Sequence, residues 1–129
     1  MSVTGRCACG AVKYTAAEPR FAFLCQCRAC QRASGSGHLA QFVSSRDGFA
    51  LTGGTAAWER TTDSGNTVVK HVCAICTTPI YNEPSAAPDM VMIMAASLDD
   101  PSRFTPSKIL YPDAAQPWDM PRLPADNGD

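Results

Sequence analysis

The stretch from residue 67 to residue 81 reads TVVKHVCAICTTPIY, and it decides the fold. Its first six residues are rich in β-branched side chains, which favour an extended strand. They lead into Cys73-Ala-Ile-Cys76, after which Pro79-Ile-Tyr81 continues as a second arm. Two strands joined by a C-x-x-C turn have the outline of a metal-binding hairpin, or knuckle. The sequence therefore predicts a β structure organised around bound metal.

Short β segments separated by turn residues continue on both sides of this hairpin. Periodicity and β-forming residues predict further strands over residues 11–14, 21–24, 38–43, 49–52, 56–61 and 91–95. A Ser-Arg-Asp-Gly turn joins 38–43 to 49–52, and Gly53-Gly54 predicts a hairpin before 56–61. Residues 31–33 leave room for one helical turn before Gly35, while the prolines from Pro101 onward exclude a long helix. We expect a mainly β, compact and antiparallel fold with little helix.

The length of 129 residues and the mass of 13.7 kDa fit one domain, which we expect to span residues 1–124. Residues 112–129 contain four prolines, so we expect an extended strap packed by Trp118 and then a loose tail over 125–129.

The charge balance bears on the class of partner. Eleven Lys and Arg face twelve Asp and Glu, for a formal net charge of -1, so there is no basic excess for binding nucleic acid. No apolar run approaches the 18 or so residues of a membrane span, and residues 1–10 do not resemble a signal peptide. We expect a soluble, cytoplasmic protein that binds neither nucleic acid nor a membrane. The oligomeric state stays open.

The seven cysteines form three groups, C-x-C, C-x-C-x-x-C and C-x-x-C. An odd number cannot all form internal disulfides, and clustered thiols in a reducing compartment more often bind metal or do chemistry. The members of the three groups are Cys7 and Cys9; Cys25, Cys27 and Cys30; and Cys73 and Cys76.

This count predicts two metal sites of different kinds. A closed structural zinc takes four ligands, whereas a reactive zinc keeps three protein ligands and one open position. Three thiolates within six residues can wrap one ion without distant help, so the middle group forms the open site. The closed site then takes the outer pairs, which ties distant segments together and contributes to folding. We expect one structural zinc and a second, labile one.

The cysteine pattern is also compatible with three different roles. Single cysteines often serve as small buried hydrophobic residues. C-x-C-x-x-C also supplies three of the four thiolates of an iron–sulfur cluster. A zinc ribbon that only binds partners accounts for the outer pairs, although it explains the middle group poorly.

Charged residues near the middle group are candidates for substrate binding. Arg28 and Arg32 flank the middle group. Their functional role would be to lower the thiolate pKa values or to bind a substrate carboxylate, and the alternative is that they lie in a solvated turn. His38 follows a Gly-Ser-Gly segment that is a candidate pocket wall. His71 lies two residues before Cys73 and so on its side of a strand, where packing is the commoner role.

Taken together, these motifs resemble the family of glutathione-dependent formaldehyde-activating enzymes, the GFA or CENP-V/GFA family. The resemblance runs in family order over about residues 5–124. The matching segments are GRCACGAV (5–12), CQCRACQRASG (25–35), FALTG (49–53), CAIC (73–76), SLDDP (97–101) and QPW (116–118).

The resemblance implies a β-tent fold, a structural zinc on the outer cysteine pairs and a second zinc on the middle group. It also implies a carbon–sulfur lyase that joins glutathione to formaldehyde. This chain has Gln26 where the family usually has histidine, and Thr77 where the family usually has glycine. We therefore expect a zinc-dependent enzyme that acts on a small-molecule thiol or thiol adduct of an aldehyde or related electrophile. The alternative is a non-catalytic, zinc-stabilised β module that binds a partner or small molecule.

Overall fold

The computed structural model describes residues 1–124, so the tail predicted over 125–129 lies outside the described residues. Within this part, strands dominate, and the mainly β fold with little helix is confirmed. The helical segments are α1 (Arg28–Ser34) and four short 3-10 turns, η1 (Arg46–Gly48), η2 (Ala95–Ser97), η3 (Pro101–Arg103) and η4 (Pro112–Ala114). The strands are β1 (Val3–Arg6), β2 (Lys13–Ala16), β3 (Phe21–Cys25), β4 (Leu39–Ser45), β5 (Ala50–Thr52), β6 (Thr55–Thr61), β7 (Thr67–Cys73), β8 (Pro79–Pro84), β9 (Met90–Met94) and β10 (Lys108–Leu110).

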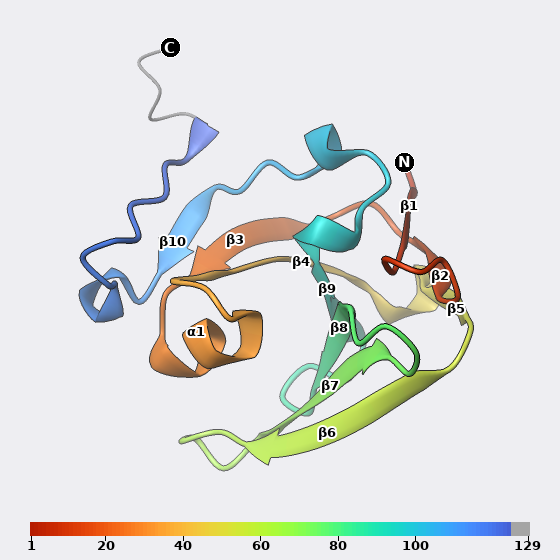
Figure 1. Ribbon diagram of the computed structural model, residues 1–129, viewed down its shortest axis with the longest axis horizontal. Coiled ribbons are helices and arrows are strands. Elements are labelled where there is room, and N and C mark those ends of the chain that lie inside the picture. Colours follow the sequence, from red (N-terminus) through yellow and green to blue (C-terminus); the bar gives the residue numbers. More distant parts are fainter. Residues whose placement is uncertain (125–129) are drawn as a thin grey trace.

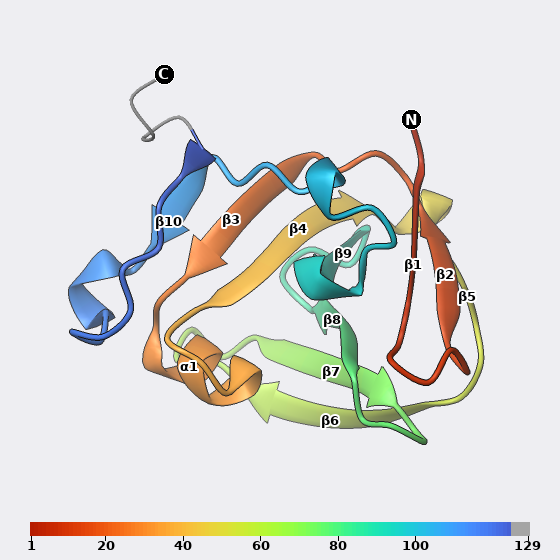
Figure 2. The same cartoon turned by 45° about the horizontal axis from the view of Figure 1, so that its top comes forward.

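The strands of residues 1–124 form two sheets (Figure 1). The smaller has the order β1-β2-β5, and the larger has the order β10-β3-β4-β9-β8-β7-β6. All pairings between these strands are antiparallel, as predicted, except that β10 runs parallel to β3. Figure 2 shows the small sheet at one end of the molecule and β10 at the other. Between residues 1 and 124, no helix has the length and apolar character that crossing a membrane requires.

The turn at residues 45–48 joins β4 to β5 as predicted, but the hairpin predicted at Gly53-Gly54 is wrong. Strands β4, β5 and β6 follow one another in the chain, but β5 pairs with β2, whereas β4 and β6 belong to the large sheet. Gly53 is therefore a crossing point rather than a hairpin turn. Its φ is +96°, and a Cβ atom there would lie 2.1 Å from the carbonyl oxygen of Ala11, so the close approach of two chain segments requires glycine. Turn residues mark where the chain bends but not which strand it joins.

Strands β3, β4 and β9 of the large sheet bury side chains on both faces, and each face packs in a separate core. Because successive side chains along β3, β4 and β9 point to opposite faces, Ala22, Phe42 and Ile93 lie on one face of the sheet and the residues next to them in the sequence lie on the other. The first core lies against the small sheet and includes Cys7 and Cys73, whereas the second includes Cys25 and Cys30. Each cysteine cluster is thus anchored in its own core.

Helix α1 is longer than the single turn predicted from residues 31–33, because the middle cysteine group itself begins it. Cys27 is the N-cap, and its sulfur accepts a hydrogen bond from the backbone N–H of Cys30 at 3.3 Å. The helix ends at Gly35, whose φ of 72° is left-handed.

The strap follows β10, but Trp118 does not pack it. Its side chain is 67% exposed, so that prediction is wrong. Polar contacts hold the strap instead, because amide groups of α1 and its preceding loop reach it. The side-chain amide of Gln31 donates to the carbonyl of Ala114 at 2.9 Å, and Gln116 donates to Gln31 at 2.9 Å.

Candidate metal centres

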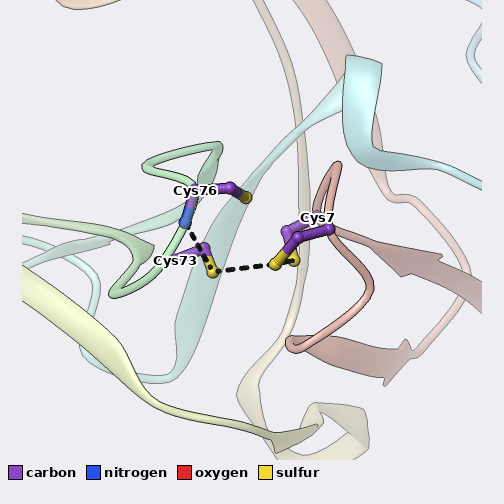
Figure 3. A group of neighbouring side chains, drawn as sticks. Cys7, Cys73 and Cys76 are labelled. Atoms are coloured by element: carbon purple, nitrogen blue, oxygen red, sulfur yellow. Dashed lines mark hydrogen bonds between the residues drawn. The ribbon is translucent and has the colours of Figure 1, made fainter.

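Two loops from different sheets bring the outer cysteine pairs together. Cys7 and Cys9 lie between β1 and β2, Cys73 ends β7, and Cys76 lies in the turn before β8. Figure 3 shows the side chains of Cys7, Cys73 and Cys76 facing the space between the loops, and all four sulfur atoms lie within 4.8 Å of one another. The sulfurs of Cys7 and Cys9 are 3.6 Å apart, and those of Cys9 and Cys73 are 3.9 Å apart. Ligands 2.3 Å from a tetrahedral zinc are roughly 3.8 Å apart, so this four-cysteine cluster fits such an ion.

Backbone N–H groups surround these sulfurs. Val12 donates to the sulfur of Cys7 at 3.3 Å, and Ile75 and Cys76 each donate to that of Cys73 at 3.4 Å. Hydrogen bonds from Thr78 lower the pKa of Cys76 to about 5. Because thiols bind metal as thiolates, these donors prepare the cluster for a cation.

The middle group forms a second cluster at the start of α1. Cys25 ends β3, Cys27 caps the helix, Cys30 lies in its first turn, and the three sulfurs lie within 4.8 Å of one another. The neighbouring Cys30 thiol lowers the pKa of Cys25 to about 6 against the opposing effect of burial, while the positive charge of Arg60 adds to the shift. The pKa of Cys30 is raised by its closeness to Cys25 and by burial. This three-cysteine cluster can hold a metal ion with one position left for another ligand.

The two clusters lie toward opposite ends of the β6–β7 hairpin. Cys73 ends β7, whereas α1 lies near the other end of the hairpin, where β6 ends and β7 begins (Figure 2). The separation agrees with the predicted division into two sites. A change in one cluster can therefore be studied without direct disturbance of the other.

Two cavities meet at the three-cysteine cluster, and Cys30 lines both. One, of about 410 Å³, lies between α1 and the large sheet. The other, of about 640 Å³, is lined by all three cysteines and by Arg28 and Tyr111. The three-cysteine cluster is therefore open to small molecules from two sides.

The structure separates the predicted substrate contacts. Arg32 lines the first cavity and Arg28 the second, but His38 lines neither. Its Nδ1 atom lies 3.0 Å from both carboxylate oxygens of Asp119 in the strap. Sequence reasoning missed Arg60, which lines both cavities. Its alternation with Trp58 on one face of a predicted strand is the signal that points to it.

Gln26 occupies the position where the family resemblance leads one to expect histidine. It is buried, and its side-chain amide donates to Asp119 at 3.1 Å. Its backbone carbonyl accepts from the side chain of Gln31 at 2.8 Å. The residue connects the cysteine loop to the strap and brings no titratable group to the cluster.

Fold and sites together define a small two-sheet β protein with one four-cysteine and one three-cysteine cluster, each able to hold a metal ion. The sequence model of the glutathione-dependent formaldehyde-activating enzyme family matches residues 2–114, and the chain belongs to this family. Among curated proteins, none matches the chain. A crystal structure of a Rhodobacter sphaeroides protein is similar, with a TM-score of 0.63 and 17% sequence identity over 82% of this chain and 98% of that one. At this identity the likeness supports the fold alone.

Proposed function

We propose that the chain is a zinc-dependent enzyme of the carbon–sulfur lyase type that acts on the thiol adduct of a small carbonyl compound. Cys25, Cys27 and Cys30 hold the working zinc, and the four-cysteine cluster holds a structural one. One observation carries the proposal: three sulfurs are gathered at the meeting point of two cavities. A site with three protein ligands and access for a small molecule is the arrangement of a reactive zinc.

Zinc bound at the three-cysteine cluster would supply a Lewis acid that keeps a substrate thiol deprotonated. Three thiolates on one divalent ion carry a formal charge of -1, which opposes an anionic thiol. Arg28, Arg32 and Arg60 line the adjoining cavities and supply the compensating positive charge.

The reaction is an addition and its reverse. A bond forms between the thiol sulfur and the carbonyl carbon, the S–H bond and the carbonyl π bond break, and the thiol proton ends on the carbonyl oxygen, which takes the π electrons. No electrons are exchanged with a third compound, so the chemistry needs no redox cofactor. Glutathione is the thiol that the family's description names, and formaldehyde is the carbonyl compound.

The proposal is tested by the rate at which a thiol and a carbonyl compound reach equilibrium. Zinc-loaded protein is mixed with glutathione and an aldehyde, and NMR follows the loss of the carbonyl signal. The reverse reaction is followed as the return of the carbonyl signal from the adduct. We expect acceleration in proportion to protein concentration, and its loss in Cys27→Ser. Equal rates with wild-type protein, with Cys27→Ser and without protein would favour a non-catalytic zinc-stabilised module.

A further inference from the structure

The cavity of about 410 Å³ has a floor built by one cross-strand row of the large sheet. The register pairs Trp58 with Lys70, Lys70 with Asn82, and Asn82 with Met92, across β6, β7, β8 and β9. Residues paired in this way point to the same face of a sheet. All four line the cavity, and α1 closes it from the other side.

Three cations surround this space. Arg32 comes from α1, Arg60 from β6 and Lys70 from β7. Lys70 is fixed in place because its Nζ atom donates to the carbonyl of Ala33 at 2.9 Å. Among residues 1–124, none of the three lies within 4.0 Å of a carboxylate, and no acidic residue lines the cavity. In a chain of net charge -1, this grouping leaves positive charge for a ligand.

The cavity wall also includes two buried amide side chains and several apolar side chains. Gln41 and Asn82 are buried, and Asn82 donates to the side-chain oxygen of Gln41 at 3.3 Å. Leu39, Val68 and Met92 add apolar surface. A one-carbon aldehyde is only slightly larger than water, whose share of liquid volume is about 30 Å³, so it would leave most of this space unfilled.

We infer that this cavity selects a carbonyl compound, or its thiol adduct, that carries both a carboxylate and an apolar body, as an oxo acid does. Its role in the reaction rests on the proposed function, but the binding itself does not. The arginines bind the carboxylate by charge-assisted hydrogen bonds, and Met92, Val68 and Leu39 contact the apolar body. Cys30 on the cavity wall places the ligand beside the three-cysteine cluster. The carboxylate is unchanged when sulfur adds to the carbonyl carbon.

Trp58 gives a direct readout of binding. The chain has two tryptophans, and the other, Trp118, is 67% exposed in the strap, so Trp118→Phe leaves Trp58 as the only indole without disturbing a core. In this background, 4-methyl-2-oxopentanoate is titrated against the matched neutral ketone, 4-methyl-2-pentanone. We expect a saturable fluorescence change with the oxo acid and at least tenfold weaker binding of the ketone.

Charge variants locate the site. Arg60→Gln and Arg32→Gln should each weaken binding of the oxo acid about tenfold, since each removes a charged hydrogen-bond donor. Lys108→Gln removes the same charge from an exposed position on β10, at the far edge of the sheet, and should leave the affinity unchanged. Equal affinity for acid and ketone, no saturable change, or full affinity in an Arg32→Gln, Arg60→Gln double variant would overturn the inference.

One further variant separates this inference from the proposed function. Cys27→Ser should still bind the oxo acid, because the side chains that bind the acid belong to α1 and the large sheet and do not include Cys27. If binding persists while the wild-type protein accelerates no reaction, the carboxylate site stands and the proposed enzyme falls. If the reaction is accelerated but the oxo acid does not bind, the carboxylate site falls alone.

Discussion

The sulfur atoms of Cys9 and Cys73 lie 3.9 Å apart, although 64 positions separate the two residues in the sequence. One belongs to the loop between strands of the small sheet, and the other ends a strand of the large sheet. A metal held between them joins the two sheets and closes a long chain loop, whereas the three-cysteine cluster spans six consecutive residues. The two clusters therefore differ in what they contribute to folding.

Loss of a ligand should reveal this difference. Cys73→Ser should lose its metal and most of its cooperative unfolding transition. Metal binding at a site built from distant segments contributes its binding free energy, several kcal/mol or more, to folding. Cys27→Ser should remain folded, with a melting temperature close to the wild-type value and about one zinc fewer per chain. Circular dichroism melts and zinc analysis on reduced protein check both. Matching melting curves for the two variants would contradict the division of the cysteines.

Thr77 follows the last cysteine with a φ of 64°, which is unfavourable for a β-branched residue. Thr77→Gly should raise the free energy of unfolding by about 1 kcal/mol, or the melting temperature by a few degrees. The control is Thr105→Gly, since Thr105 is exposed and lies outside the left-handed region, so that the change there should not stabilise. A loss of stability in Thr77→Gly would show that the Thr77 side chain contributes more than the strain costs.

Glu83 joins β7 and β8 to the η1 turn. Burial raises its pKa, but hydrogen bonds with His71 and Arg46 outweigh this effect, and the net pKa is lowered from 4.5. The charged form is thus favoured in the folded state, so its stabilisation is complete above pH 4.5 and disappears as the pH falls below that value.

Between pH 7 and pH 4, the free energy of unfolding should therefore fall less in Glu83→Gln than in the wild type. We expect a difference of about 1 kcal/mol, the size for one charged, hydrogen-bonded group that is partly exposed. Urea unfolding of both proteins at the two pH values measures the difference. Metal release in acid affects both proteins alike and cancels in the comparison. Parallel losses would show that Glu83 carries no net pH-dependent stabilisation.

Asp119 fastens the strap to the molecule. Its carboxylate accepts from Gln26 at 3.1 Å and lies 3.0 Å from the Nδ1 atom of His38. Asp119→Ala should make the strap more susceptible to limited proteolysis and cost about 1 kcal/mol of stability. Asp113→Ala removes an exposed carboxylate from the η4 turn and is the control. Identical cleavage patterns would mean that contacts such as Gln116 to Gln31 suffice to hold the strap.

Sequence patterns predict the local elements better than they predict which strands pair. The hairpin around Cys73 and Cys76 is predictable because β-forming residues flank a C-x-x-C turn, and ligand counting alone suggests how the cysteines divide. The parallel strand β10 is not predictable in this way, because its three residues, Lys108–Leu110, carry no periodic signal and are held by pairing with β3. Aromatic character favours packing of Trp118, yet polar contacts hold the strap and leave this side chain exposed.

Of the four basic residues around the three-cysteine cluster, only two are predictable from the sequence. Arg28 and Arg32 lie next to the cysteines in the sequence, so proximity identifies them. Arg60 and Lys70 reach the same place through the register of β6 and β7, which the amino-acid order alone does not specify.

The proposed function requires that the three-cysteine cluster holds a zinc with one replaceable ligand. Zinc K-edge absorption of fully loaded protein tests it most directly, with and without saturating glutathione. One four-sulfur and one three-sulfur site give a mean of about 3.5 sulfurs per zinc. We predict that this mean rises to about 4 when the thiol binds, and that it does not change in Cys27→Ser. An unchanged sulfur number in the wild type at saturating thiol would contradict the account.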